Sequence, residues 1–170
     1  VKVNQGVAYA NDRIFRGTPD GWLLALNAKT GKLMWEHQIG DPLTSKSFSG
    51  APQVFQGLVI IGVGDGSDEP SGRIMAYDAV TGREVWRYTL ERAKFFSGGV
   101  SGSTYTIDAS LGHIFIPIGK PDSALLANKD TEDKRFIGGL IILDAITGMK
   151  KSQYPFRWDE EHDFTLNAAP

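Results

Sequence analysis

An acidic stretch near the end of the chain holds the densest set of side chains that could carry chemistry. Trp158 to Asp163 contains four carboxylates and the imidazole of His162. Carboxylate oxygens and imidazole nitrogens are ligands for divalent cations, so these residues could form a metal site. A solvated acidic loop is the alternative, because runs of like charge are usually exposed. The residues alone leave both interpretations open.

Other stretches have suitable residue types but lack the pattern that their chemistry needs. The glycine-rich run Gly98 to Gly102 is not closed by a lysine followed by serine or threonine, which argues against a phosphate-binding loop. His37 and His113 lie within predicted strands at a spacing that matches no metal motif, so we interpret both as ordinary strand residues. The chain contains no cysteine, which excludes disulfides and thiolate metal sites.

Length and composition point to a turn-rich β-protein. The chain has 170 residues, 20 glycines and four tryptophans, a composition typical of an all-β fold whose aromatic side chains fill the space between sheets. A net charge of -2 and the lack of a basic cluster argue against a nucleic-acid partner. No apolar run reaches the roughly 18 residues of a membrane span. No signal peptide is recognisable at Val1 to Asn4, and we expect a segment of a longer protein.

One hairpin motif occurs three times and organises the rest of the chain. An apolar run leads into Asn or Asp, Ala, a variable residue, Thr and Gly, and a second extended run follows. The Asn or Asp side chain can hydrogen-bond the backbone of the turn, and the glycine supplies the positive φ that closes it. The turn glycines are Gly31, Gly82 and Gly148, which lie 51 and then 66 residues apart.

Repeats at this period predict a β-propeller made of four-stranded antiparallel blades. We assign blade A to residues 1–48, blade B to 49–95, blade C to 96–156 and the start of the next blade to 157–170. The longer spacing in blade C reflects a polar insertion at residues 119–135, predicted to be a surface loop. Three blades cannot close a ring, so we expect a longer parent chain or self-association.

The series of motifs resembles the PQQ-dependent quinoprotein dehydrogenases over essentially the whole chain. In that family the tryptophan that closes each docking hairpin packs on the next blade, and Trp35 and Trp86 match it, whereas Ser152 departs from it. Glu69 to Gly72 and the stretch from Thr131 to Phe136 are similar to the membrane-bound glucose, quinate and polyol branch. The resemblance implies a segment of a dehydrogenase that acts on a sugar, polyol or other alcohol.

The resemblance also implies a mechanism and its residues. Such enzymes transfer hydride from the alcohol carbon to PQQ, with calcium as a Lewis acid and an aspartate as base. Asp163 matches the base, although a turn aspartate is the alternative. The other matches are Asp65, with Asp68 and Glu69 as substitutes, for the metal, and Ser101, Gly102 and His162 for the cofactor. A solvated acidic loop is the alternative for the metal residues.

Departures from the family pattern support a second hypothesis. Gly102 stands where the family has the tryptophan on which PQQ stacks, and Lys120 matches an asparagine metal ligand; Ser67 also departs. The alternative is a non-catalytic PQQ-like propeller that serves as a scaffold or assembly module. For either hypothesis the resemblance implies a periplasmic or other extracytoplasmic location in a bacterium, and we expect the segment alone to be inactive.

Overall fold

Three antiparallel sheets make up the part of the chain that the structure describes, residues 6–39, 50–63, 72–89, 105–118 and 139–155 of a computed structural model. Within those ranges there are twelve strands and no helix, and each sheet has four strands in the order of the chain. Consequently no helix in these ranges could cross a membrane. The all-β fold predicted from the repeats is confirmed.

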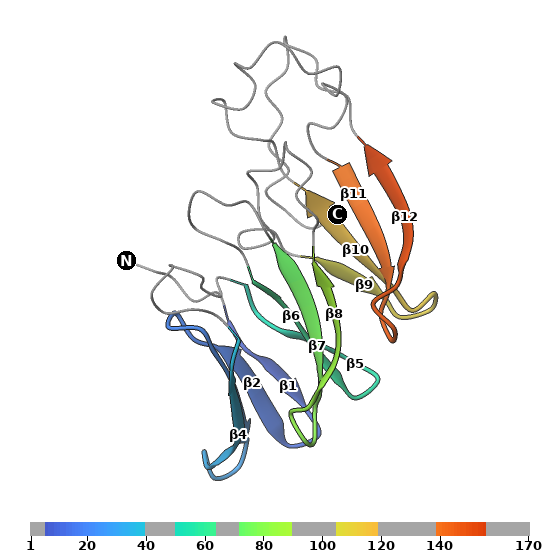
Figure 1. Cartoon of the computed structure of the whole chain (residues 1–170). Coiled ribbons are helices and arrows are strands. Elements are labelled where there is room, and N and C mark those ends of the chain that lie inside the picture. The colour runs from blue at the N-terminus through green and yellow to red at the C-terminus, as the bar shows by residue number, and fades with distance from the viewer. Residues whose placement is uncertain (1–5, 40–49, 64–71, 90–104, 119–138, 156–170) are drawn as a thin grey trace.

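Each sheet is a meander of neighbouring strands (Figure 1). Sheet 1 contains β1 (Ala8–Ala10), β2 (Arg13–Gly17), β3 (Trp22–Asn27) and β4 (Leu33–Gln38). Sheet 2 contains β5 (Gln53–Phe55), β6 (Leu58–Val63), β7 (Arg73–Asp78) and β8 (Glu84–Thr89). Sheet 3 contains β9 (Thr106–Asp108), β10 (His113–Ile118), β11 (Gly139–Asp144) and β12 (Lys150–Pro155). The sheets fall within the ranges assigned to blades A, B and C, and residues 157–170 lie outside the described residues.

The three docking hairpins share one turn geometry. The Oδ1 atom of Asp78 accepts hydrogen bonds from the backbone N–H groups of Val80 (3.1 Å) and Thr81 (2.7 Å) and from the Thr81 hydroxyl (2.8 Å). Asn27 and Asp144 make the corresponding bonds in sheets 1 and 3. This side-chain cap replaces backbone partners that a tight turn cannot supply, which explains why Asn or Asp stands at this position.

These caps lower the pKa of the aspartates that make them. The backbone N–H of Thr147 is the main cause of the lowered pKa of Asp144, which falls to about 2, and Lys151 (Nζ to Oδ2 3.3 Å) contributes. The backbone N–H of Thr81 likewise lowers the pKa of Asp78. Because these donors favour the charged form, the carboxylates stabilise the turns more when they are ionised than when they are protonated.

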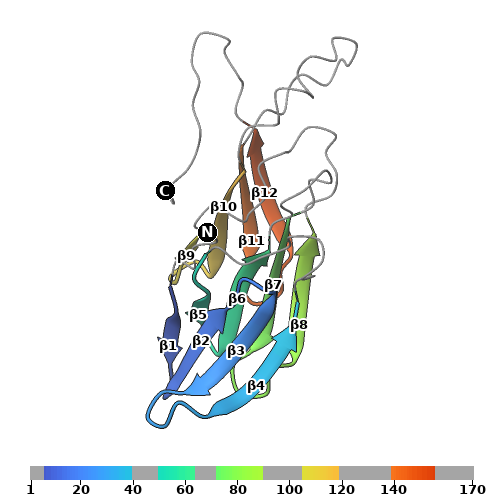
Figure 2. The same ribbon diagram turned by 90° about the vertical axis from the view of Figure 1, so that its left-hand side faces the viewer.

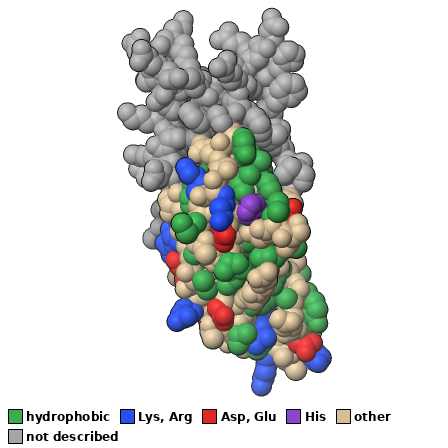
Figure 3. All heavy atoms as spheres, turned by 90° about the vertical axis from the view of Figure 1, so that its right-hand side faces the viewer, with side chains coloured by type: hydrophobic (Ala, Val, Ile, Leu, Met, Phe, Trp, Pro, Cys, Tyr) green, Lys and Arg blue, Asp and Glu red, His purple; other side chains and the backbone are tan. Residues whose placement is uncertain are grey.

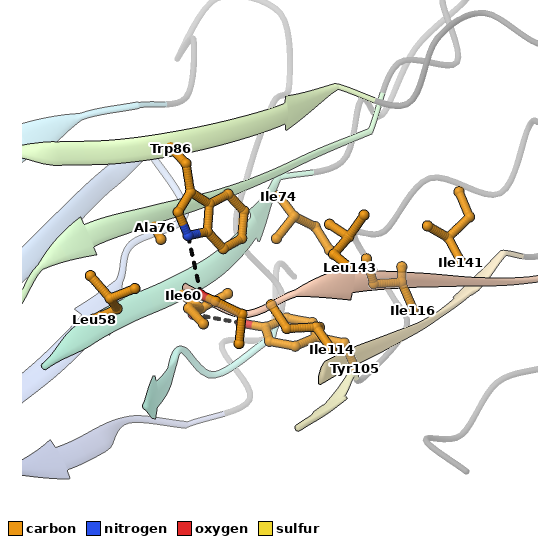
Figure 4. Packing of buried hydrophobic residues seen from close by; sticks show 11 residues of the cluster. Leu58, Ile60, Ile74, Ala76, Trp86, Tyr105, Ile114, Ile116, Ile141 and Leu143 are labelled. Carbon is orange, nitrogen blue, oxygen red and sulfur yellow. Dashed lines mark hydrogen bonds between the residues drawn. The ribbon is translucent and has the colours of Figure 1, made fainter. Parts of the chain in front are cut away.

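Two apolar clusters join the sheets. Phe15 and Leu23 of sheet 1 pack with Val59, Ile61 and Met75 of sheet 2, and the opposite face of sheet 2 packs against sheet 3. Strand β6 is therefore buried on both faces, which explains why its sequence is apolar at nearly every position. Figure 4 shows the second cluster, in which Trp86 projects from sheet 2 toward sheet 3.

A tryptophan and a glycine lock each sheet to the next. The indole Nε1 of Trp35 donates to the carbonyl oxygen of Ala79 (3.3 Å), and that of Trp86 donates to Ala145 (3.2 Å). A Cβ built on Gly148 would lie 2.6 Å from the Trp86 ring, and one on Gly82 would lie 2.8 Å from the Trp35 ring. The turn glycines thus satisfy both the positive φ of the hairpin and the close approach of the indole.

The structure predicts that Gly148→Ala destabilises the protein more than Gly112→Ala. Both glycines have φ near +65 to +69, so each alanine incurs the left-handed cost of about 1–2 kcal/mol in the free energy of unfolding. At Gly112 nothing lies within 4 Å of the added methyl, whereas at Gly148 it overlaps Trp86, adding roughly 1–3 kcal/mol. Urea denaturation of both variants measures the difference. Equal losses would show that the indole does not press on Gly148.

The hairpin carboxylate predicts an acid-sensitive component of stability. The pKa of Asp144 is about 2 in the folded chain and about 3.9 when unfolded. Its contribution is therefore complete above about pH 4 and is lost as the pH falls toward 2. In Asp144→Asn, which keeps the acceptor oxygen, the free energy of unfolding should depend less on pH in this range. A profile identical to that of the wild type would contradict the assignment.

Candidate functional site

The strand topology divides each sheet into two ends. The docking hairpins and the turns between β1 and β2, β5 and β6, and β9 and β10 lie at one end, which we call the hairpin end. Because the strands alternate in direction, all other connections leave from the second end, which we call the loop end. Figures 1 and 2 show the hairpin end at the bottom of the sheets.

All three candidate segments begin from the loop end. Asp65, Asp68 and Glu69 follow the end of β6 at Val63. Ser101 and Gly102 precede the start of β9 at Thr106, and His162 and Asp163 follow the end of β12 at Pro155. Residues that are far apart in the sequence are thus attached to the same end of adjacent sheets, which is the placement that a shared site would need.

The candidate residues themselves lie outside the described ranges. These are Asp163 for catalysis, Ser101, Gly102 and His162 for the cofactor, and Asp65, Asp68 and Glu69 for the metal, together with the departures Ser67 and Lys120. Their assignments stay predictions. The structural docking residues Trp35, Trp86, Gly31, Gly82 and Gly148 are all described, and they lie toward the hairpin end.

The described carboxylates do not form a metal site. Among the described residues no group of three or more His, Asp and Glu side chains could hold an ion. Asp78, Asp108 and Asp144 all cap turns at the hairpin end, and the Ser110 hydroxyl is the main cause of the lowered pKa of Asp108. Within the described ranges these three carboxylates thus serve as turn caps, and the candidate metal and cofactor residues all belong to segments that continue from the loop end.

Tyr105 is a residue that the sequence did not single out. It precedes β9, is buried, and donates from its hydroxyl to the carbonyl oxygen of Ile60 on β6 (2.5 Å). Its own carbonyl accepts from the side chain of Gln53 on β5, and burial raises the pKa of its phenol. Tyr105 thus ties sheet 3 to sheet 2 directly beside the segment that contains Ser101 and Gly102. In the sequence, the only indication of this contact is a single aromatic residue before a short strand.

Tyr77 and His37 form a second contact between sheets. The His37 ring stacks on Tyr77 with a centroid separation of 5.9 Å, and it also lies 5.7 Å from the ring of Trp35. The Tyr77 hydroxyl lies 3.4 Å from Oε2 of Glu84, and burial is the main cause of its raised pKa. His37 and His113 both lie in strands as predicted, and His37 serves the interface between sheets 1 and 2.

Comparison with known proteins places this fold in a family. Residues 2–170 match the PQQ family described as the glucose, ethanol and alcohol dehydrogenase β-propeller domain. The chain is 49% identical over 86 residues to quinohemoprotein alcohol dehydrogenase ADH IIB of Pseudomonas putida, covering 51% of this chain and 12% of that protein. It is 44% identical over 84 residues to the lanthanide-dependent methanol dehydrogenase of Methylacidiphilum fumariolicum, covering 49% of this chain and 14% of the relative.

A solved structure extends the likeness across all three sheets. The quinohemoprotein alcohol dehydrogenase of Comamonas testosteroni superimposes with a TM-score of 0.79 and 29% identity, covering 98% of this chain and 29% of that protein. The chain thus spans less than a third of the length of each of these relatives. Their names are those of alcohol and methanol dehydrogenases, so the narrower resemblance to the glucose, quinate and polyol branch stays a prediction.

The match over nearly the whole sequence, the three stacked sheets and the indole contacts between them lead to one assignment: the chain belongs to the β-propeller domain family of the PQQ-dependent glucose, ethanol and alcohol dehydrogenases.

Proposed function

We propose that these residues form three adjacent blades of a PQQ-dependent dehydrogenase that oxidises an alcohol. The observation that carries the proposal is the family match over residues 2–170. The strand topology supports it, because it attaches the three candidate segments to one end of neighbouring sheets. The remaining sheets of the ring would come from the same longer polypeptide, and the substrate would be a small alcohol or a sugar.

The candidate residues have separate chemical roles in this proposal. Bound PQQ would supply the hydride acceptor, with a metal ion as Lewis acid. Asp163 would accept the proton of the substrate hydroxyl, as a positioned carboxylate can when its alcohol lies within hydrogen-bond reach. Asp65, with Asp68 or Glu69, would contribute hard oxygen ligands, and Ser101, Gly102 and His162 would contact the cofactor. Tyr105 would hold the start of β9 against sheet 2.

The identity of the metal is a finer part of the proposal. We favour calcium, because carboxylate oxygens suit a hard cation with flexible coordination. One relative is a lanthanide-dependent enzyme. Lanthanide ions are also hard cations that prefer oxygen ligands, so both kinds of ion belong in the test. A periplasmic or other extracytoplasmic location is proposed by resemblance to the family.

The second candidate function is a non-catalytic propeller that serves as a scaffold. It is favoured by Gly102, which provides no ring for the flat cofactor to stack on, and by Lys120, whose ammonium group would repel a cation. The sheets and their docking contacts would be equally useful in either protein. Cofactor binding distinguishes the two candidates.

Cofactor binding is predicted to stabilise the full-length protein that carries these sheets. PQQ with Ca²⁺ or La³⁺ at about 100 times its Kd should raise the free energy of unfolding by about 2.7 kcal/mol, because it binds only the folded state. Thermal unfolding and quenching of tryptophan emission measure the effect with each ion. If neither ion produces a shift with excess PQQ, the scaffold is the better description.

Asp163→Asn is predicted to lower alcohol oxidation, measured with an artificial electron acceptor, by roughly 100- to 10,000-fold, the usual range for a general base. PQQ binding should change little, because the asparagine keeps the size of the side chain. Asp159→Asn is the matched control, since it removes the same charge from the same stretch and should retain activity. Equal losses in both variants would assign the effect to the charge of the stretch and remove Asp163 as the base.

A further inference from the structure

The turn that accepts the Trp86 indole is held in place by an ionisable side chain. The carbonyl oxygen of Ala145 accepts the indole N–H, and the preceding residue, Asp144, caps the turn. The Oδ1 atom of Asp144 accepts hydrogen bonds from two backbone N–H groups and from the Thr147 hydroxyl, at 2.9–3.0 Å. Because a carboxylate accepts hydrogen bonds more strongly than a neutral carboxyl group, proton binding at Asp144 weakens the turn that positions the Ala145 carbonyl.

A second carboxylate in sheet 3 supports the same residue. The Ala145 N–H donates to the carbonyl oxygen of Gly112 (2.8 Å), in the turn between β9 and β10. That turn is capped by Asp108, whose Oδ1 atom accepts from the backbone N–H groups of Ser110 (2.8 Å) and Leu111 (3.1 Å). The Ser110 hydroxyl donates to the same oxygen (2.6 Å). Ala145, which accepts the indole, is thus held between two turns that are both capped by carboxylates.

The corresponding contact between sheets 1 and 2 depends on one carboxylate cap. Asp78 caps the turn in which the Ala79 carbonyl accepts the Trp35 indole. The Ala79 N–H donates to the carbonyl oxygen of Gly57 (2.8 Å), in the turn between β5 and β6. The residues of this turn, Gln56 and Gly57, carry no carboxylate. The two indole contacts therefore differ in the number of ionisable caps that support them.

Charged groups on the neighbouring strands favour the ionised form of the sheet 3 caps. Lys151 on β12 places its Nζ atom 3.3 Å from Oδ2 of Asp144. His113 on β10 is paired in register with both Asp108 and Asp144. The Ser110 hydroxyl and, to a smaller extent, the charge of His113 lower the pKa of Asp108. The Asp144 side chain is 25% exposed, and Figure 3 shows charged side chains of both signs toward the hairpin end, so protons reach this cap without prior opening of the sheets.

Acid is the condition in which the caps weaken. The pKa of Asp144 is about 2 in the folded chain, below the roughly 3.9 of an unfolded aspartate. In sheet 2 the backbone N–H of Thr81 is the main cause of the lowered pKa of Asp78, and Arg83 contributes. His37 of sheet 1 faces the same turn. Because the folded pKa values are depressed, the stabilisation by the caps is complete above about pH 4 and is lost as the pH falls toward 2.

A different pair of hydrogen bonds joins sheets 2 and 3 near their first strands. The Tyr105 hydroxyl donates to the carbonyl oxygen of Ile60, and the side chain of Gln53 on β5 donates to the Tyr105 carbonyl. Figure 4 shows Tyr105 and Trp86 in the same contact, and Trp86 belongs to the last strand of sheet 2, β8. Burial raises the pKa of the Tyr105 phenol, and the Gln53 amide does not ionise, so neither group changes its charge in acid. Acid therefore weakens the Trp86 side of the contact and leaves the Tyr105 side unchanged.

We propose that proton binding at Asp108 and Asp144 releases the Trp86 indole from sheet 3 while the Tyr105 contact persists, so that acid lets the two sheets pivot before either unfolds. The coupling is reciprocal, because an indole docked on the turn favours the ionised caps. The Trp35 contact responds less steeply to acid, because it depends on Asp78 alone. This inference concerns the contacts between sheets and is independent of the proposed dehydrogenase activity.

Fluorine NMR of the full-length protein labelled with fluorotryptophan tests the proposal, because each indole gives its own signal. Trp86→Phe and Trp35→Phe identify the two signals, since each substitution removes one of them. As the pH is lowered from about 6 to about 2, the Trp86 signal should move toward the shift of a solvent-exposed indole. The Trp35 signal should move less, and circular dichroism should still report β-sheet.

Asparagine substitutions assign the carboxylates, because asparagine keeps the acceptor oxygen of each cap but does not ionise. Asp108→Asn and Asp144→Asn should each remove part of the acid shift of the Trp86 signal, and together they should remove most of it. Asp78→Asn is the matched control in sheet 2, because it should reduce the shift of the Trp35 signal and spare that of Trp86. Asn27→Asp places a carboxylate in the cap of sheet 1, where neither indole docks, and should change neither signal.

Two results would overturn the proposal. The Trp86 signal could titrate in the double asparagine variant as it does in the wild type. All indole signals could change together with the loss of the β-sheet signal, which would show global unfolding instead of release of one contact. Tyr105→Phe tests the pivot, because without the hydroxyl the protein should unfold at a higher pH than the wild type. An unchanged midpoint of acid unfolding would contradict the role of Tyr105.

Discussion

The hydrogen bond from a tryptophan on one sheet to a backbone carbonyl on the next is the constraint on which the structure depends. Trp86 is only 7% exposed, so its indole N–H must find a partner inside the protein. The hairpin of the following sheet presents the carbonyl of Ala145, and Gly148 leaves the space for the ring. A single turn sequence therefore serves folding of the hairpin and docking of the sheets, which explains why Ala, Thr and Gly recur together.

The residues that join the sheets lie toward the hairpin end, whereas the candidate catalytic, cofactor and metal residues belong to segments that continue from the loop end. At the hairpin end the carboxylates of Asp78, Asp108 and Asp144 accept hydrogen bonds from several N–H and O–H groups, which lower their pKa values. Such groups are poor proton acceptors near neutral pH. The candidate catalytic, cofactor and metal residues are attached at the loop end, where the strands fix where a connection starts and finishes but not its sequence. The segments that carry Asp65 and Asp163 can thus vary without altering the docking contacts.

The sequence predicted the sheets well because local and long-range signals agree. Asn27, Asp78 and Asp144 mark turns, their glycines mark positive φ, and the apolar runs between them had only to be paired with neighbours. The turn glycines at 31, 82 and 148 each lie between the two outer strands of one sheet, as the hairpin motif predicted. The resemblance also led to the correct family.

Other features of the structure could not be predicted from the sequence, for physical reasons. The Tyr105 hydroxyl donates a hydrogen bond to the carbonyl of Ile60, which lies 45 positions away in the sequence, and a periodic sequence pattern cannot predict such a contact. Ile142 pairs with Ser152 in sheet 3, where sheets 1 and 2 pair alanine with tryptophan, and this difference can be recognised only once the strand register is known. The candidate site residues lie in connections that do not repeat in the sequence. The alternating pattern of apolar and polar side chains that predicts a strand gives no information on such connections.

The two sheet contacts are built from different interactions, although they share one motif. Between sheets 2 and 3, a buried indole, the Tyr105 hydroxyl and the Gln53 amide all form hydrogen bonds across the contact. Between sheets 1 and 2, Trp35 is half-buried, and stacking of His37 on Tyr77 extends the contact. Hydrogen bonds to buried carbonyls fix the relative position of two sheets more narrowly than ring stacking does, because they are directional. The docking motif therefore joins each sheet to the next, while the residues around each tryptophan determine how firmly a given pair is held.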